Sequence, residues 1–436
     1  MALATQFLKL HPATTYDLLD IWTTDGCRPY KNLVPTYTFL SAHPRLWRFL
    51  YHLSNTTPYA IMMNLHTRFM CERKIRKTIA SFEADVVVSV HPTMTAVPQH
   101  SLRKIERRTG RHTPIFTVVT DLGSGHCTWF TRRCEKMFVA STRIRRLARR
   151  RGWVSNNKLV MSGLPIRESF ATQAAALNGD RHSKESLNYV GKMRDRLGID
   201  PIRKVVLVMG GGEGVGSLGD IVDELYNKLT DEGTKATVVV VCGRNEKLKK
   251  DLEGRDWVLE AEPKRGKRER VKKRLRRGAA WVSGDETWVK NKGLVKTTQT
   301  VEEKKNVHVI GLGFVKNMDE WMVASDVLLS KAGPGSIAEA ASVGLPIMLT
   351  SFLPGQEAGN VDVVVDGGFG DYSSTPSKIA TVVSSWLQNE SILSKMSKNA
   401  SKASKPEAAK EIVKVILESA LVWRDLNDVG DRKKHN

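Results

Sequence analysis

Residues 204–216 read KVVLVMGGGEGVG, an apolar run of strand length followed at once by a glycine-rich turn. Short runs of β-branched and aliphatic residues favour a buried strand. A glycine-rich turn at the end of such a strand can present backbone N–H groups to a phosphate. This stretch therefore predicts a parallel α/β sheet that binds its ligand at the carboxyl ends of its strands.

The same arrangement recurs further along the second half. Glycines also follow the predicted strands at Gly243, at residues 311–313 and at residues 333–335. Gly333 to Ser336 precede the helical stretch IAEAA, whose free N–H groups and dipole favour a diphosphate. Ser336 either caps that helix or bonds a phosphate oxygen. Glu339 either completes a capping box or binds a ribose, and we favour the ribose.

A third polar cluster lies at residues 354–360, which read PGQEAGN. Gln356, Glu357 and Asn360 place donors and acceptors together on a loop flanked by glycines. Sugar hydroxyls need this chemistry, although a solvated turn is the simpler alternative.

Short apolar runs alternate with helical stretches in both halves, which is the pattern of parallel α/β layers. We expect strands at 16–21, 85–90, 115–120, 137–140 and 159–162, and then at 204–209, 237–242, 307–310, 326–330 and 346–350. Residues 2–10 have the pattern of an amphipathic helix. The polar segment 173–189 lacks apolar periodicity, so we expect domains at 1–172 and 201–436 joined by a linker, 173–200.

Composition narrows the possible partners. The chain has 436 residues, 41% of them hydrophobic, and no apolar run long enough to predict a transmembrane helix. Its five cysteines form no CxxC pair, so neither a disulfide framework nor a zinc site is supported. A net charge of +22 suits nucleic acid, an anionic membrane or a phosphorylated substrate. The first residues match neither a signal peptide nor a transit peptide.

Several motifs together resemble known glycosyltransferases. LVMGGGEGVG, CGRN, LLSKAGPGSIAEA and LPGQEAGN are similar to the carboxyl-terminal domain of glycosyltransferase family 28. YDLLDIW, LWRFLYHLSNTTP, ADVVVSVHPTM and TVVTDLGSGHCTWF resemble the amino-terminal domain of plastid monogalactosyldiacylglycerol (MGDG) synthases. The resemblance implies an α/β GT-B architecture, with two Rossmann-like domains facing one another across a cleft. It also implies inverting transfer of galactose from UDP-galactose to diacylglycerol.

The resemblance assigns residues to the donor. It implies that the diphosphate meets Gly210, Gly211, Gly212 and Glu213 together with Gly333, Pro334, Gly335 and Ser336. Glu339 would bind the ribose, the backbone of Phe314 and Val315 the uracil, and Gln356 and Glu357, beside Asn360, the galactose. No DxD pair follows a predicted strand, so we expect neither a metal ion nor a cofactor.

The acceptor side is assigned to the first domain. His91, Asp121 and His126 lie at predicted strand ends and are the candidate general bases. Pro92, Trp129 and Phe130 are the expected contacts of the acceptor lipid. For Trp129 and Phe130 the alternative is a place in the core, which is common for aromatic side chains.

The family's first domain opens with a strand, a glycine-rich loop bearing a histidine, and a helix. The present chain begins with ALATQFLKLHP, residues 2–12, which resembles the second half of that helix. We therefore expect the strand and the loop to be missing because the gene prediction is incomplete. Without them, residues 1–172 would fold poorly alone, and loss of the histidine would slow transfer by about 10²- to 10⁴-fold.

The expected partners are a UDP-sugar, diacylglycerol and an anionic lipid surface such as phosphatidylglycerol or phosphatidic acid. The basic runs 103–111 and 143–151 would dock peripherally on a plastid envelope or thylakoid membrane. Alternatives are a related enzyme that transfers glucose to diacylglycerol or GlcNAc to a lipid-linked precursor, and an inactive UDP-sugar-binding paralogue.

A nucleic-acid-binding protein is a further alternative. The basic segment 263–277, inside an expected surface insertion at 262–299, would be its binding element or else a solvated loop. We expect no nucleic-acid partner, because no recognised binding motif accompanies that charge.

Overall fold

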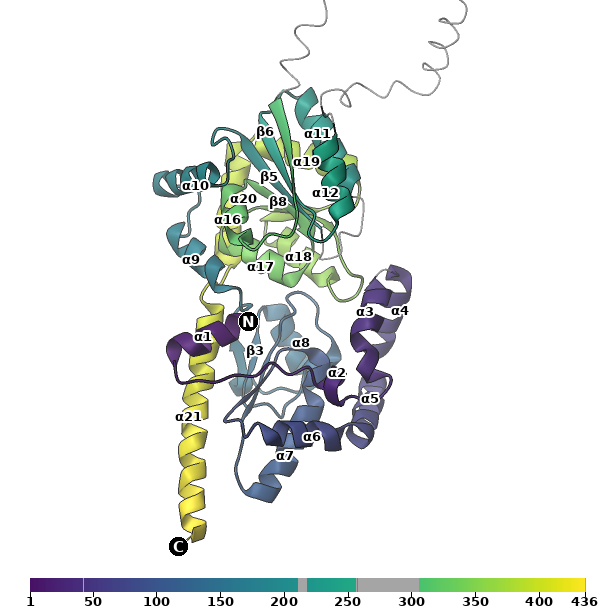
Figure 1. Cartoon of the computed structure of the whole chain (residues 1–436), viewed down its shortest axis with the longest axis vertical. Helices are drawn as coiled ribbons and strands as arrows, with labels where there is room; N and C mark the ends of the chain where they lie inside the picture. The colour runs from purple at the N-terminus through teal and green to yellow at the C-terminus, as the bar shows by residue number, and fades with distance from the viewer. Residues whose placement is uncertain (42, 211–217, 256, 258–305, 436) are drawn as a thin grey trace, which may run out of the picture. The chain divides into compact units, whose positions relative to one another are not determined.

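The computed structural model describes residues 1–41, 43–210, 218–255, 257 and 306–435 (Figure 1). The chain divides into two compact units. Unit 1 comprises Met1–Gly191, Ser330–Tyr372 and Ser391–Asn436, and unit 2 comprises Lys192–Leu329 and Ser373–Glu390. Gly211, Gly212, Glu213 and the basic insertion lie outside the described residues.

The first sheet confirms four of the five strands expected in the first half. All its strands are parallel, in the order β1-β2-β3-β4. Their bounds are Val87–Ser89, Ile115–Val118, Met137–Val139 and Leu159–Met161. The strand expected at 16–21 is wrong, because Asp20 caps helix α2 (Ile21–Asp25) by accepting from the N–H groups of Trp22 and Thr23.

The second sheet confirms all five strands expected in the second half. Its order is β10-β9-β8-β5-β6-β7, and the paired strands are parallel. The bounds are Lys204–Met209 (β5), Ala236–Val241 (β6), Val307–Leu312 (β7), Val327–Lys331 (β8), Ile347–Ser351 (β9) and Gly370–Tyr372 (β10). Strand β10 was not expected, because its sequence GDY has no apolar run. Two parallel sheets with helices between their strands confirm the α/β class.

Two expectations about domain boundaries are corrected. The expected linker is largely helical, with α9 at Glu168–Ala176 and α10 at Lys184–Arg196. The last helix, α21 (Ala408–His435), packs with α1 (Ala2–Leu10) on the first sheet rather than on the second (Figure 1). Its Ile412, Val413 and Ile416 share one apolar cluster with Phe7, Phe116 and Phe138. The expected second domain therefore does not extend to residue 436.

The remaining helices have the following bounds. They are α3 (Leu33–Ser41), α4 (Pro44–Ser54), α5 (Thr57–Met70), α6 (Glu72–Ser81), α7 (Ala96–Thr109), α8 (Thr142–Gly152), α11 (Leu218–Asp231), α12 (Glu246–Gly254), α16 (Met318–Ala324), α17 (Pro334–Ser342), α18 (Ala358–Asp366), α19 (Pro376–Leu387) and α20 (Glu390–Ala403). Short 3₁₀ turns lie at η1 (Tyr30–Asn32), η2 (Pro92–Met94), η3 (Cys127–Trp129) and η4 (Asn156–Lys158). Within the described ranges, no helix is both long enough and apolar enough to span a membrane. The five cysteines are free thiols, and the Sγ atoms of Cys27 and Cys71 lie 3.0 Å apart.

Gly152, the last residue of α8, allows that helix to pack directly against Phe130. A Cβ at Gly152 would lie 2.4 Å from the Cβ of Phe130, whereas a Cβ at Gly191, inside α10, would meet nothing within 4 Å. We expect Gly152→Ala to lower the free energy of unfolding by about 1–3 kcal/mol. Gly191→Ala, the control, should raise it by about 0.5–1 kcal/mol because glycine is costly inside a helix. Urea denaturation measures both, and equal stability of the two variants would refute this packing.

Candidate functional site

The amino terminus of α17 is open at the end of β8. The helix begins at Pro334 with Gly333 as its N-cap, and no described side chain caps it. Proline suits this first position because its missing N–H is not needed there. In the described part of the chain, a Cβ at Gly335 would meet no atom within 4 Å. The N–H groups of Gly335 and Ser336 belong to the first turn of the helix, where no intrahelical carbonyl accepts from them. The capping box considered for Ser336 and Glu339 is wrong, because Ser336 is the third helical residue rather than the N-cap.

An ion pair between a buried carboxylate and a partly exposed lysine lies beside this helix end. The carboxylate of Glu357, which is 5% exposed, accepts from Lys331 Nζ at 2.7 Å and from the backbone N–H of Leu353 at 2.8 Å. A Cβ at Gly333 would lie 3.7 Å from Lys331 Cε and 4.0 Å from Glu357 Oε1. Sequence reasoning missed Lys331, although a cation at the last position of a strand before AGPGS was a usable signal.

A second ion pair involves the carboxylate expected to bind a ribose. Arg167, the N-cap residue of α9, donates from Nε to Glu339 Oε1 at 2.7 Å and from Nη2 to Oε2 at 2.9 Å. This bidentate geometry is typical of strong arginine–carboxylate pairs. Binding of a ribose by Glu339 stays a prediction, and it requires the diol to replace the guanidinium. Arg167 was also missed, because nothing in the sequence links it to α17.

The role expected for Asn360 is corrected by its hydrogen bonds. Its side chain is buried, its Nδ2 donates to the carbonyl oxygen of Ala332 at 2.8 Å, and its Oδ1 accepts from the N–H of Gly123 at 2.7 Å. Asn360 therefore holds the loop before α17 against the loop that follows β2. Its amide is committed to backbone groups rather than open to a sugar, whereas Gln356 is half-buried.

Asp121 and Trp129 form a buried pair in the loop after β2. Trp129 Nε1 donates to Asp121 Oδ2 at 2.7 Å, and Asp121 is 8% exposed. Burial raises the pKa of Asp121 to about 6, against the hydrogen bonds from Trp129 and from the backbone of His126. The nearby charge of Glu357 raises this pKa further, so the carboxylates of the two loops interact electrostatically.

The lipid contacts expected for Trp129 and Phe130 are corrected. Trp129 is 1% exposed and Phe130 is 7% exposed, and both belong to an apolar cluster with Val139 and Ile144. Both side chains therefore lie in the core. Trp129 contacts the candidate site only through its hydrogen bond to Asp121. Pro92 opens the turn η2 and is half-buried.

The two candidate histidines are engaged by neighbouring hydroxyl groups. His126 Nε2 is 3.1 Å from Ser54 Oγ, and its Nδ1 is 2.8 Å from Thr128 Oγ1. Burial, followed by the charges of Arg151 and His91, lowers the pKa of His126 to about 4. His91 Nδ1 lies 3.0 Å from Thr93 Oγ1, and desolvation lowers the pKa of His91 against the opposing charge of Asp20. Both rings are therefore weak bases.

The pKa of His126 predicts a loss of stability in acid. A histidine whose folded-state pKa is depressed contributes stability above its unfolded pKa of 6.5, and this is lost as the pH falls through the folded value. We expect up to about 3 kcal/mol to be lost between pH 6.5 and pH 4. His126→Gln, which can hydrogen-bond but does not titrate, should make this decline shallower. Urea denaturation at several pH values measures it, and identical slopes would contradict the assignment.

Three expected donor residues belong to unit 2. Gly210 directly follows β5. Phe314 follows β7, and its side chain is 74% exposed, while Val315 is half-buried. The contact expected between the backbone of Phe314 and Val315 and the uracil stays a prediction.

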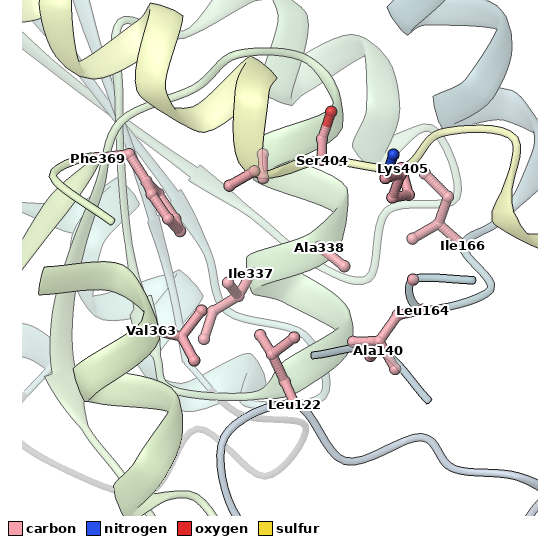
Figure 2. Close-up of a pocket in the computed structure, with 13 residues that line it drawn as sticks. Leu122, Ala140, Leu164, Ile166, Ile337, Ala338, Val363, Phe369, Ser404 and Lys405 are labelled. Carbon is pink, nitrogen blue, oxygen red and sulfur yellow. The ribbon is translucent and has the colours of Figure 1, made fainter. Parts of the chain in front are cut away.

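An apolar cavity of about 50 Å³ lies on another side of α17. Figure 2 shows Ile337 and Ala338 of α17 around it, together with Leu122, Ala140 and Leu164. Sites for drug-sized ligands usually have about 300–1,000 Å³ and contain a few polar groups. This cavity is therefore too small and too apolar to be the nucleotide site.

Family profiles match both halves of the chain. The profile described as monogalactosyldiacylglycerol (MGDG) synthase matches residues 4–166. The profile of the glycosyltransferase family 28 C-terminal domain matches residues 289–412, which include Lys331, the α17 loop and Glu357.

Individual relatives match over nearly the whole chain. The chain is 31% identical over 403 residues to monogalactosyldiacylglycerol synthase 1, chloroplastic, of Arabidopsis thaliana, covering 91% of this chain and 63% of the relative. It is 32% identical over 403 residues to probable monogalactosyldiacylglycerol synthase 2, chloroplastic, of Oryza sativa subsp. indica, covering 91% and 72%. The chain thus spans somewhat under two thirds of the Arabidopsis relative's length. Among solved structures, MurG of Acinetobacter baumannii matches with a TM-score of 0.48 and 13% identity, covering 80% of this chain and 77% of that one.

Proposed function

The chain belongs to the monogalactosyldiacylglycerol synthase family, and from this we propose that it is an inverting glycosyltransferase that moves galactose from UDP-galactose to 1,2-diacylglycerol. One structural observation supports this activity independently of the family assignment. The uncapped amino terminus of α17 adjoins the Lys331–Glu357 ion pair, so amide donors, a cation and a carboxylate meet at one point. A sugar diphosphate needs this combination of groups.

The first turn of α17 and the adjacent ion pair indicate how the UDP-sugar would be bound. The N–H groups of Gly335 and Ser336, with the helix dipole, would hold the diphosphate oxygens and stabilise UDP as it leaves. Lys331 adds a positive charge beside them. Glu357 stays the proposed partner of the galactose hydroxyl groups, and a hydroxyl would share its carboxylate with Lys331 and the N–H of Leu353. Backbone amides and a side-chain cation stabilise the charge of the leaving group, so we propose that transfer needs no metal ion and no cofactor.

Asp121 is the proposed general base. Its pKa of about 6 leaves it mostly ionised at neutral pH while keeping it a stronger base than His126, whose pKa is about 4. In the proposed reaction the acceptor hydroxyl attacks the anomeric carbon from the face opposite UDP. Its proton passes to the Asp121 carboxylate as the bond from the sugar to the diphosphate breaks. Attack from the opposite face gives inversion.

The proposed location is a plastid membrane, either the envelope or the thylakoid. Curated relatives are named chloroplastic, and the acceptor of the proposed reaction resides in a bilayer. The protein would bind such a membrane peripherally, with phosphatidylglycerol or phosphatidic acid as the anionic lipid partner.

Radiolabelled turnover tests the proposed function. The full chain is incubated with vesicles that contain diacylglycerol and with labelled UDP-galactose or UDP-glucose. The proposal predicts a labelled monogalactosyl lipid, formed faster from UDP-galactose and unaffected by EDTA. A glucosyl product would favour the related diacylglycerol glucosyltransferase, and tight UDP binding without any lipid product would favour an inactive paralogue.

A further inference from the structure

The ring of Tyr51, in the last turn of α4, packs against the backbone of Gly355. Tyr51 is buried, with 8% of its surface exposed. A Cβ added at Gly355 would lie 2.9 Å from Cε1 and 3.0 Å from Cγ of Tyr51, closer than carbon atoms approach one another. Gly355 also has a φ of +85°, in the left-handed region that favours glycine. The contact with Tyr51 and the backbone conformation therefore both require glycine at position 355.

The same ring contacts a second loop of the candidate site. We call residues 352–357, between β9 and α18, the β9 loop, and residues 119–126, between β2 and η3, the β2 loop. The ring centroids of Tyr51 and His126 lie 5.4 Å apart in an edge-to-face arrangement, which is favourable for aromatic pairs. Tyr51 therefore touches both the loop of the proposed galactose contacts and the loop of the proposed base.

Hydrogen bonds at the end of α4 hold His126 against Tyr51. Ser54 Oγ donates to the carbonyl oxygen of Tyr51 at 3.1 Å, so it accepts from His126 Nε2, which lies 3.1 Å away. His126 Nδ1 then accepts from the hydroxyl of Thr128 at 2.8 Å and from its backbone N–H at 3.4 Å. Both ring nitrogens are thus used, and the imidazole is fixed beside the phenol ring.

The β2 loop also meets the start of α18 directly. The N–H of Gly123 donates to Asn360 Oδ1 at 2.7 Å, and the N–H of Gly359 donates to Ser124 Oγ at 2.9 Å. A Cβ added at Gly123 would overlap the carbonyl oxygen of Gly359, so the two backbones touch. Two segments joined at one point can still turn about it. The ring of Tyr51 supplies a second point of contact and removes that freedom.

Electrostatic interactions place Tyr51 close to the proposed reacting groups. Burial, followed by the negative charge of Asp121, raises the pKa of Tyr51, so its phenol stays protonated at neutral pH and does not act as a base. The charge of Glu357 in turn raises the pKa of Asp121. Tyr51 therefore lies where the two carboxylates approach one another.

We propose that Tyr51 is a positioning residue, whose ring fixes the β9 loop against the β2 loop and thereby sets the position of Glu357 relative to Asp121. Its effect on transfer rests on the proposed function, whereas the fixing of the loops does not. A misplacement of about 1 Å between reacting groups can slow a reaction about 10²-fold. The ring should therefore act on kcat, while UDP binding at α17 should not depend on it.

Two substitutions at Tyr51 separate positioning from a general structural role. In the turnover assay, Tyr51→Leu should lower kcat by at least about 10²-fold, whereas Tyr51→Phe, which keeps the ring, should stay within about threefold. The Kd for UDP should change less than about twofold in both. Tyr226→Leu is the control, because Tyr226 is a buried tyrosine of α11, 2% exposed. Equal losses of kcat in Tyr51→Leu and Tyr226→Leu, or in Tyr51→Leu and Tyr51→Phe, would overturn the proposal.

A double-mutant cycle tests the contact with Gly355. Gly355→Ala places a methyl group against the Tyr51 ring and should lower kcat by itself. If both residues act at one contact, the loss in the double variant Gly355→Ala with Tyr51→Leu should be at least about tenfold smaller than the product of the two single losses. Losses that simply multiply would overturn the proposal. Thermal denaturation shows that each variant is folded at the assay temperature.

Hydrogen exchange without substrate gives a readout that does not require activity. The amides of residues 119–126 and 352–357 should exchange faster in Tyr51→Leu than in the unmodified chain and in Tyr51→Phe. Unchanged exchange in either loop would overturn the proposal. If the unmodified chain makes no galactolipid but both loops respond, the proposed function fails and the fixing of the loops stands. If the chain is active and Tyr51→Leu keeps its kcat, the positioning role fails and the proposed function stands.

Discussion

Gly335→Val should abolish UDP binding while leaving the protein folded. Among the described residues, no atom lies within 4 Å of a Cβ added at Gly335, so the substitution clashes with none of them. In the proposed site that space belongs to the diphosphate, and a branched side chain there would keep it from the N–H groups of Gly335 and Ser336. We expect the Kd for UDP to rise by at least about 10²-fold, which corresponds to about 3 kcal/mol.

Calorimetric titration with UDP measures this loss, and thermal denaturation checks the fold. Gly254→Val is the matched control, because Gly254 ends α12 and its added Cβ also has no atom of the described ranges within 4 Å. The control should bind UDP like the unmodified chain. If Gly335→Val binds UDP with unchanged affinity, α17 is not part of the donor site.

Asp121→Asn should lower turnover by about 10²- to 10⁴-fold, the usual contribution of a general base. The asparagine oxygen can still accept from Trp129 Nε1, so the loop should keep its shape. In the unmodified chain kcat/KM should rise with pH through about 6, as the carboxylate loses its proton. UDP affinity should be unchanged, because the substitution acts on the acceptor side.

The same substitution should make the protein more stable at neutral pH. The pKa of Asp121 is raised from 3.8 to about 6, so its contribution to stability is complete below pH 3.8 and is lost as the pH rises through 6. Removing the buried charge should raise the free energy of unfolding at pH 7 by up to about 3 kcal/mol. Urea denaturation between pH 4 and pH 8 measures the effect. If Asp121→Asn is fully active and no more stable than the unmodified protein, Asp121 is neither the general base nor a destabilising buried charge.

The sequence predicted the sheets well because buried parallel strands consist of continuous apolar runs. Strands β5 and β6 are such runs, and both were placed within one residue of their observed bounds. The errors occurred where a local contact outweighed the pattern, as at residues 16–21, where the Asp20 cap starts a helix. The C-terminal helix was assigned to the wrong domain, because an apolar stripe does not reveal which sheet it covers.

The site was predicted less completely than the fold. The turn of Gly333 to Ser336 stays the predicted diphosphate contact, and it was chosen because glycine-rich loops at strand ends commonly bind phosphate. Lys331 was missed although its place at the end of a strand was a usable signal. Arg167 was missed because it reaches α17 only by pairing with Glu339, which is distant in sequence. Asn360 and Trp129 were assigned to ligands because their residue types suit such roles. Burial instead commits Asn360 to backbone groups and Trp129 to Asp121.

A crystal structure of the chain with UDP is the decisive test of the proposed donor site. The diphosphate should lie at the first turn of α17, within hydrogen-bonding distance of the N–H groups of Gly335 and Ser336 and close to Lys331. Ordered UDP elsewhere, with the first turn of α17 unoccupied, would contradict it.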